Sequence, residues 1–150
     1  MARRVYELMN PDVVCASPTT AAGDALKLLL DRCVTDAPVV TGEGWIVGVI
    51  SEAALVRYIE APSTASETGR FFTDEEDFRD LGDTPAHRTG TPVEKLMSSA
   101  IFPVTRETGV AVAANIMRER GLHRLFVTDH GRLVGVVTSL DLMRIVEELG

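Results

Sequence analysis

Hydrophobic and polar residues follow one plan that occurs twice along this chain. In the second half, β-branched and aromatic residues cluster over 124–128 and 132–137, on both sides of the turn sequence Asp129-His130-Gly131. This pattern predicts a hairpin of two short strands. The first half shows the same arrangement around a turn at 41–44, so we expect one hairpin in each half.

Helical periodicity flanks both hairpins. Apolar residues recur at helical spacing over about 21–32 and 109–120, which predicts an amphipathic helix before each hairpin. A closing helix follows each hairpin. In the second half Thr138 is a good N-cap for it, and Asp141, three residues later, can complete a capping box. Each half also opens with a short lead-in helix followed by a short first strand. We expect the helix at 5–9 and the strand at 13–15 in the first half, and the helix at 92–97 and the strand at 101–104 in the second.

The two halves align with one another, which indicates an internal duplication. Residues 48–55 align with residues 135–142 at an offset of 87 (135 minus 48), and residues 25–34 align with residues 113–122 at an offset of 88 (113 minus 25). The extra residue falls in the turn at 41–44, where an insertion is tolerated. The β-α-β-β-α order of each half predicts an α+β fold, with two small repeats packed through their sheets and a cleft between them as the pocket.

The duplication divides the chain into three parts. We assign residues 1–60 to the first repeat, 61–90 to a connector and 91–150 to the second repeat. Within the connector, Thr73 and Glu76 form a capping-box signature, which predicts a short acidic helix. We interpret the connector as a solvated link anchored by a few aromatic residues, with docking of a partner as the alternative.

Composition and charge exclude several classes of function. The net charge of −7 argues against a nucleic-acid-binding surface. The longest uncharged apolar run, 44–50, is far shorter than the roughly 20 residues that span a bilayer, and the N-terminus lacks the apolar core of a signal peptide. We therefore expect a cytoplasmic protein without a membrane segment. Cys15 and Cys33 have no CxxC partner and no nearby histidine, so we expect both to be buried and to bind no metal.

The repeated fragments resemble the cystathionine beta-synthase (CBS) domain, which occurs as a tandem pair called a Bateman module. The resemblance covers nearly the whole chain outside the connector, and it rests on the helix positions 25–29 and 113–117, the strands at 37–40 and 124–127, and the strand-to-helix segments at 48–51 and 135–141. It implies a pseudo-twofold pair of repeats, a cleft with up to two nucleotide positions, and a homodimer packed through helices. The ligands it implies are adenosine compounds: AMP, ADP, ATP or S-adenosylmethionine, sometimes NAD or a cyclic dinucleotide.

The strand-to-helix segment of the second repeat matches the nucleotide-binding pattern of this family. By resemblance, Gly135, Thr138 and Asp141 form the segment in which the acid accepts hydrogen bonds from the ribose hydroxyls and the hydroxyl residue meets phosphate. An ionised carboxylate can accept two donors at once, so the role is chemically sound. The alternative is that Thr138 and Asp141 only cap a helix. In the first repeat, Ala54 stands where Asp141 stands in the second, so we expect one ligand per chain.

Four further residues enter the predicted site by resemblance. His123 and Arg124 are similar to phosphate-contacting residues in the gamma subunits of AMP-activated protein kinase, and the alternative for both is a surface position at a strand edge. The matching positions of the first repeat, 35 and 36, carry no cation. The backbone around Ala100 and Ile101 would face the adenine by family analogy.

We therefore predict a regulatory, ligand-sensing module that binds an adenine nucleotide or a related adenosine compound between its repeats. It needs no cofactor, and we do not expect an enzyme, because the sequence shows no nucleophile and base pair, metal cluster or phosphate loop. The signal would pass to a separate effector protein or to the geometry of a homodimer. The alternative is a structural or interaction protein with a vestigial cleft that binds no nucleotide, which Ala54 and the acidic balance favour.

Overall fold

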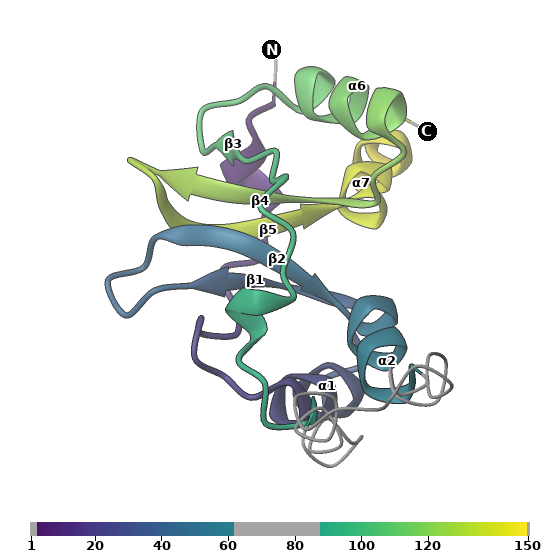
Figure 1. The fold of residues 1–150 in the computed structure, drawn as a ribbon. Coiled ribbons are helices and arrows are strands. Elements are labelled where there is room, and N and C mark those ends of the chain that lie inside the picture. Colours follow the sequence, from purple (N-terminus) through teal and green to yellow (C-terminus); the bar gives the residue numbers. More distant parts are fainter. Residues whose placement is uncertain (1–2, 62–87, 150) are drawn as a thin grey trace, which may run out of the picture.

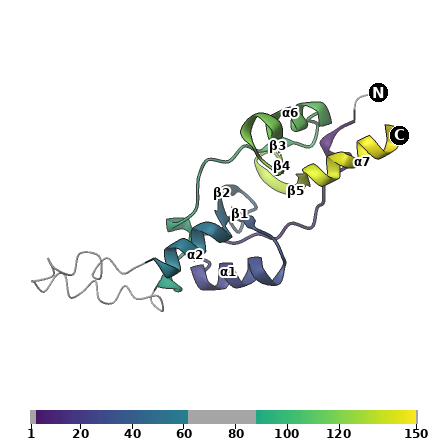
Figure 2. The ribbon, with the colours of Figure 1, turned by 90° about the vertical axis from the view of Figure 1, so that its right-hand side faces the viewer.

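The computed structural model describes residues 3–61 and 88–149, which form two repeats that face each other through their sheets. Figure 1 shows the two sheets next to each other at the centre, with one pair of helices on the outer side of each sheet. The view turned by 90° shows the same order of layers, from helices to sheet to sheet to helices (Figure 2). This arrangement confirms the predicted α+β fold with two repeats.

The first repeat contains one antiparallel hairpin and two helices. Its elements are α1 (Ala22–Asp31), β1 (Asp36–Val40), β2 (Ile46–Ser51) and α2 (Glu52–Glu60). In β1 the consecutive residues Ala37–Val39 are buried, so both faces of this strand are covered, whereas β2 buries the alternate residues Gly48 and Ile50.

The second repeat has the same order with one additional strand. Its elements are β3 (Val104–Thr105), α6 (Val110–Arg120), β4 (Arg124–Asp129), β5 (Arg132–Thr138) and α7 (Ser139–Leu149). The predicted hairpin is confirmed, and its turn places His130 and Gly131 in the left-handed region with φ of 53° and 84°. A side chain at Gly131 would also collide with the ring of Trp45, because the hairpin tips of the two repeats are in contact.

The first strand of each repeat is shorter than the pattern predicted. Within the described residues of the first repeat, a single parallel bridge between Ala16 and Val39 stands in place of the predicted strand at 13–15. In the second repeat, β3 pairs parallel with β4 only from Val104, at the end of the predicted strand at 101–104. The residues before these pairings leave the sheets because they run from one repeat to the other.

The two lead-in segments are exchanged between the repeats. The predicted lead-in helices are short 3-10 helices, η1 (Val5–Glu7) and η4 (Val93–Lys95). Val5 is fully buried in the core of the second repeat, whereas Val93 is fully buried in the core of the first. Each lead-in therefore completes the core of the other repeat.

Backbone pairing continues this exchange beyond the lead-in helices. Asn10 forms a bridge with Val136 of β5, and Ser98 forms the equivalent bridge with Val49 of β2. The chain then crosses back to its own repeat along residues 10–16, the first crossing, and residues 98–104, the second crossing. The packing units thus differ from the linear segments 1–60 and 91–150, whose boundaries stay a prediction.

Both cysteines are exposed, so the prediction that they are buried is wrong. Cys15 lies in the first crossing, and Cys33 lies in the turn between α1 and β1 with φ of 55°. Their neighbours Val14 and Val34 line a cavity between the repeats, whereas neither cysteine is among its lining residues. The apolar context of the sequence therefore belongs to the neighbours and not to the thiols.

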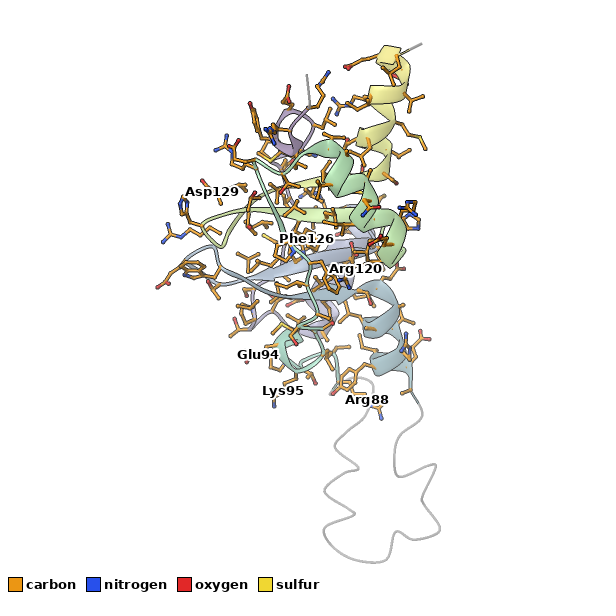
Figure 3. The ribbon with its side chains drawn as sticks, turned by 90° about the horizontal axis from the view of Figure 1, so that it is seen from above. Arg88, Glu94, Lys95, Arg120, Phe126 and Asp129 are labelled. Atoms are coloured by element: carbon orange, nitrogen blue, oxygen red, sulfur yellow. The ribbon has the colours of Figure 1, made fainter. Side chains whose placement is uncertain are left out.

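Arg88 ties the two borders of the connector together. Its guanidinium is buried beside the C-terminal end of α2, where it donates to the carbonyl oxygens of Tyr58, at 3.3 Å, and of Ala61 (Figure 3). The predicted acidic helix with Thr73 and Glu76 lies outside the described residues. Among the residues that are described, no helix has the length and apolar character needed to span a membrane.

Candidate functional site

A first cavity, the Ile101 cavity, lies between the repeats against the second crossing. Its volume is about 310 Å³. Residues Ala100, Ile101 and Phe102 of the crossing form one wall, and residues 35–36 and 121–126, at the starts of β1 and β4, form the others. The wall is therefore built from both repeats.

A second cavity, the Thr138 cavity, lies against the first crossing and has a volume of about 170 Å³. The crossing contributes Asn10, Asp12, Val13 and Val14, and the end of β5 contributes Thr138. The remaining lining residues come from the two hairpins and the turn before β1: Val34, Pro38, Arg124, Phe126 and Val136.

The two cavities are related by the internal repeat. An offset of 88 places residues 100–102 of the Ile101 cavity on residues 12–14 of the Thr138 cavity. Arg124 and Phe126 line both cavities, so their side chains lie between the Ile101 cavity and the Thr138 cavity. Figure 3 shows the position of Phe126.

The predicted site residues are divided between the cavities. Ala100, Ile101 and His123 line the Ile101 cavity, Thr138 lines the Thr138 cavity, and Arg124 lines both. Gly135 and Asp141 are not among the lining residues of either cavity. The seven residues therefore do not form one site, and the predicted adenine-facing backbone belongs to the cavity away from Thr138.

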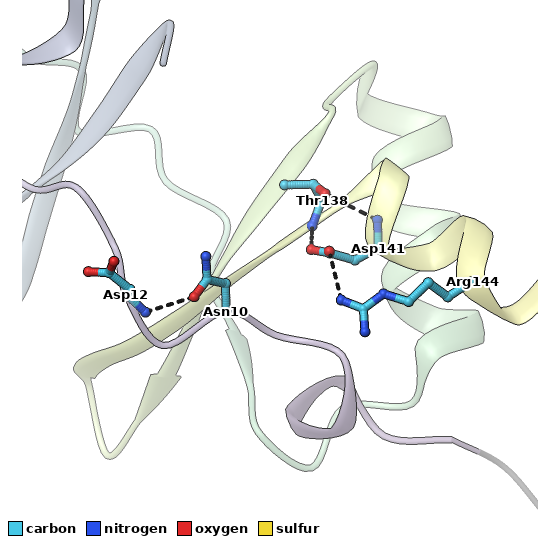
Figure 4. A network of polar contacts seen from close by, with 5 residues as sticks. All are labelled: Asn10, Asp12, Thr138, Asp141 and Arg144. Carbon is cyan, nitrogen blue, oxygen red and sulfur yellow. Dashed lines mark hydrogen bonds and ion pairs between the residues drawn. The ribbon is translucent and has the colours of Figure 1, made fainter. Parts of the chain in front are cut away.

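The carboxylate of Asp141 caps α7, as the sequence predicted. Asp141 Oδ2 accepts a hydrogen bond from the Thr138 backbone N–H at 2.8 Å, and the Asp141 N–H donates to Thr138 Oγ1 at 3.2 Å (Figure 4). Asp141 Oδ1 has a longer contact of 3.4 Å with Arg144 on the exposed side of the helix. A carboxylate has about four acceptor positions, so the capping box leaves part of this capacity unused.

Gly135 supports the lead-in segment. A Cβ at this position would lie 2.8 Å from Met9 Sδ and 3.1 Å from the Asn10 carbonyl oxygen. Gly48, the equivalent residue, is covered in the same way by Met97 and Ser98. The glycine of each strand therefore allows the exchanged lead-in to approach closely, whereas the sequence analysis placed Gly135 in the nucleotide-binding segment.

The first backbone groups of α7 are largely satisfied by the protein. Ser139 N–H donates to the His123 carbonyl oxygen at 2.9 Å, and Asp141 N–H is bound by the Thr138 hydroxyl. An anion at this helix end would compete with these bonds. The imidazole of His123 is exposed, and His123 lines both the Ile101 cavity and an open pocket between α6 and the start of α7.

The charged pair between Asp36 and Arg124 joins the repeats at the cavity wall. Arg124 Nη1 lies 3.1 Å from Asp36 Oδ1, and the two side chains are 27% and 29% exposed. Burial raises the pKa of the Asp36 carboxyl above its ordinary value, and the Arg124 charge counteracts this only in part. The half-buried carboxylate of Asp36, whose charged form is disfavoured by burial, therefore lies next to Arg124, the cation that was predicted to bind phosphate.

Comparisons with known proteins identify the fold. A family model of the CBS domain matches residues 5–61 and 93–148. The chain belongs to the CBS-domain family. The solved structure of CBSX2 in complex with AMP is 27% identical to this CBS pair and covers 97% of both chains with a TM-score of 0.73. The CBS domain pair of protein MJ0100, in complex with 5-methylthioadenosine and S-adenosyl-L-methionine, is 18% identical, covers 100% of both chains and has the same fold with a TM-score of 0.69.

Curated relatives of this CBS pair are longer proteins. CBSX2 of Arabidopsis thaliana is 29% identical over 93% of this chain and 62% of its own length. The A-adding tRNA nucleotidyltransferase of Aquifex aeolicus is 26% identical over 97% of this chain, which is 14% of that protein. The chain thus spans less than two thirds of these relatives.

Sequence reasoning missed the residues of the first crossing. Asn10, Asp12, Val13 and Val14 accompany Thr138 in its cavity, but none of them was among the predicted site residues of the CBS pair. The repeat offset could have found two of them, because it relates residues 12 and 13 to the predicted backbone at 100 and 101. Because the lead-ins are exchanged, the first crossing lies beside Thr138 before α7, and the second crossing lines the other cavity.

Proposed function

We propose that this CBS pair is a regulatory module that binds one adenosine compound per chain in the Thr138 cavity. The observation that carries the proposal is the composition of this cavity. An apolar surface from Val13, Val14 and Val136 lies beside the Thr138 hydroxyl and the guanidinium of Arg124. An adenine base fits the apolar surface, and the polar groups suit a ribose and a phosphate.

Asp141 does not line the Thr138 cavity, so it would meet the ribose at the rim, beside its capping partner Thr138. Its Oδ2 already binds the Thr138 N–H, whereas Oδ1 has the 3.4 Å contact with Arg144. A ribose hydroxyl at Oδ1 would replace this longer contact without breaking the cap. The first repeat has Ala54 in place of this acid, which supports a single ligand per chain.

The comparisons support the ligand class. CBSX2, with 27% identity over 97% of both chains, has been solved in complex with AMP. By analogy, we infer that the ligand of this chain is an adenosine compound that is bound and not chemically changed. Its effect would come from unequal affinity for two relative orientations of the repeats.

Outward-facing residues of α7 point to a homodimer as part of this regulation. Leu142 and Ile145 pack against the core of the second repeat. The opposite side of the helix carries apolar residues that are more than half exposed: Leu140, Met143, Val146 and Leu149. A second copy, or an effector protein that remains to be identified, would cover this face.

Thermal shift and titration calorimetry test the proposal with AMP, ADP, ATP, S-adenosylmethionine, NADH and cyclic dinucleotides. A ligand at 100 times its dissociation constant adds about 2.7 kcal/mol to the free energy of unfolding. Asp141→Asn keeps an oxygen for the cap but removes the charge, and we expect it to weaken binding at least tenfold. Asp24→Asn, an equal charge change on the exposed side of α1, is the control and should bind as the wild type does.

The alternative function is an interaction protein whose cavities bind no nucleotide. The engagement of Asp141 in a helix cap and of Arg124 in an ion pair favours it. A complete absence of stabilisation by the ligand panel would decide for this alternative, and two equal sites per chain would contradict the single-site proposal.

A further inference from the structure

Arg124 occupies a position that serves both cavities at once. It begins β4, and its side chain lines the Ile101 cavity and the Thr138 cavity. In this structure its Nη1 is 3.1 Å from Asp36 Oδ1, and Asp36 lines the Ile101 cavity. One guanidinium therefore has two candidate anionic partners, the carboxylate on one side and a ligand phosphate on the other.

Asp36 and Arg124 are equivalent positions of the two repeats. The offset of 88 relates them (124 minus 36), and each is the first residue of its strand. In the register of the hairpins, Asp36 is opposite Ser51 and Arg124 is opposite Thr138. The pseudo-twofold relation thus brings two equivalent residues of opposite charge together, so the centre of the module is neutral where an anion would need a cation.

We propose that Asp36 competes with the phosphate of a bound nucleotide for Arg124, and so selects adenosine compounds without a phosphate over those that carry one. This inference rests on the proposed function and adds a specificity-determining residue to it. A phosphate in the Thr138 cavity must either share the guanidinium with Asp36 or displace it. Both cost binding free energy, because like charges repel and a half-buried carboxylate loses its cation.

Neighbouring charges do not replace Arg124 in this role. Glu52 lines an open groove together with Asp36 and adds negative charge there. Asp12 lines the Thr138 cavity together with Arg124, and its carboxylate lies 3.9 Å from the guanidinium of Arg32. His123 lines the Ile101 cavity with Asp36, but its side chain is exposed to solvent. Among the described residues that line the Thr138 cavity, Arg124 is the one cation that a phosphate would meet.

Calorimetric titration with AMP and with adenosine tests the competition, because the two ligands differ only in the phosphate. We expect Asp36→Asn to tighten AMP binding about tenfold and to change adenosine binding less than about twofold. Asp24→Asn, with the same charge change on α1, should alter neither ligand by more than about twofold. Arg124→Gln should weaken AMP at least fivefold and leave adenosine nearly unchanged.

The outcomes separate this inference from the proposed function. An equal ratio of AMP to adenosine affinity in the wild type and in Asp36→Asn would overturn the competition while leaving adenosine binding intact. Binding of neither ligand to any of the proteins, with folded variants shown by circular dichroism, would overturn the proposed function and the competition together.

Discussion

Exchange of the lead-in segments predicts which repeat a mutation near the N-terminus will destabilise. Val5 belongs to the first repeat by sequence, yet its fully buried side chain lies in the core of the second repeat. Val5→Ala removes two methyl groups. At about 0.8 kcal/mol for each buried group, with a further cavity term, we expect a loss of about 2 to 3 kcal/mol in the free energy of unfolding.

Urea denaturation measures this loss, and hydrogen exchange locates it. With a denaturant slope of about 2 kcal/mol per molar, the midpoint should fall by about 1 M. Amides of β4, β5 and α6 should exchange faster in Val5→Ala through local opening. The matched variant Val93→Ala, in the equivalent lead-in, should instead accelerate exchange in β1, β2 and α1.

Two results would refute the reasoning. A midpoint shift of less than about 0.2 M would mean that Val5 is not packed in a core. Faster exchange confined to β1 and β2 after Val5→Ala would show that each lead-in packs against its own repeat.

Three further predictions follow from the same structure. Gly135→Ala should lower the free energy of unfolding by about 1 to 3 kcal/mol, because its Cβ would press on the lead-in segment, and an unchanged melting temperature would contradict this. Asp36→Asn should be more stabilising, relative to the wild type, at about pH 7 than at about pH 3.5. The raised pKa of Asp36 means that the folded state binds the proton more tightly and loses stability as the pH rises through that pKa, so a difference independent of pH would refute the assignment. Val146→Glu should convert a dimer into a monomer in light scattering, and equal masses of both proteins would exclude α7 as the interface.

Local patterns predicted most of the elements of this fold. Clusters of β-branched and aromatic residues identified β4 and β5, and the turn residues His130 and Gly131 have the positive φ that such a turn requires. The capping box of Thr138 and Asp141 was also predicted, because it depends on residues three positions apart. These features are set by neighbours in the sequence.

Long-range partners were beyond this reasoning. The apolar residues of a lead-in fit either core, so nothing in the pattern indicated that Val5 belongs to one repeat and Val93 to the other. The same exchange moved the predicted backbone at 100–101 away from Thr138 and brought residues 12–14 to it. Pairing of Asp36 with Arg124 likewise depends on how the repeats meet, although their equal positions were visible in the sequence.

The anchor at Arg88 gives the module a natural attachment point. Because its guanidinium binds the Tyr58 and Ala61 carbonyl oxygens, the described residues on the two sides of the connector lie at neighbouring positions. The entropic cost of closing an inserted flexible loop between two such fixed ends grows slowly with the length of the loop. Reporter proteins or binding peptides could therefore be grafted between these borders, and the two repeats would keep their relative geometry.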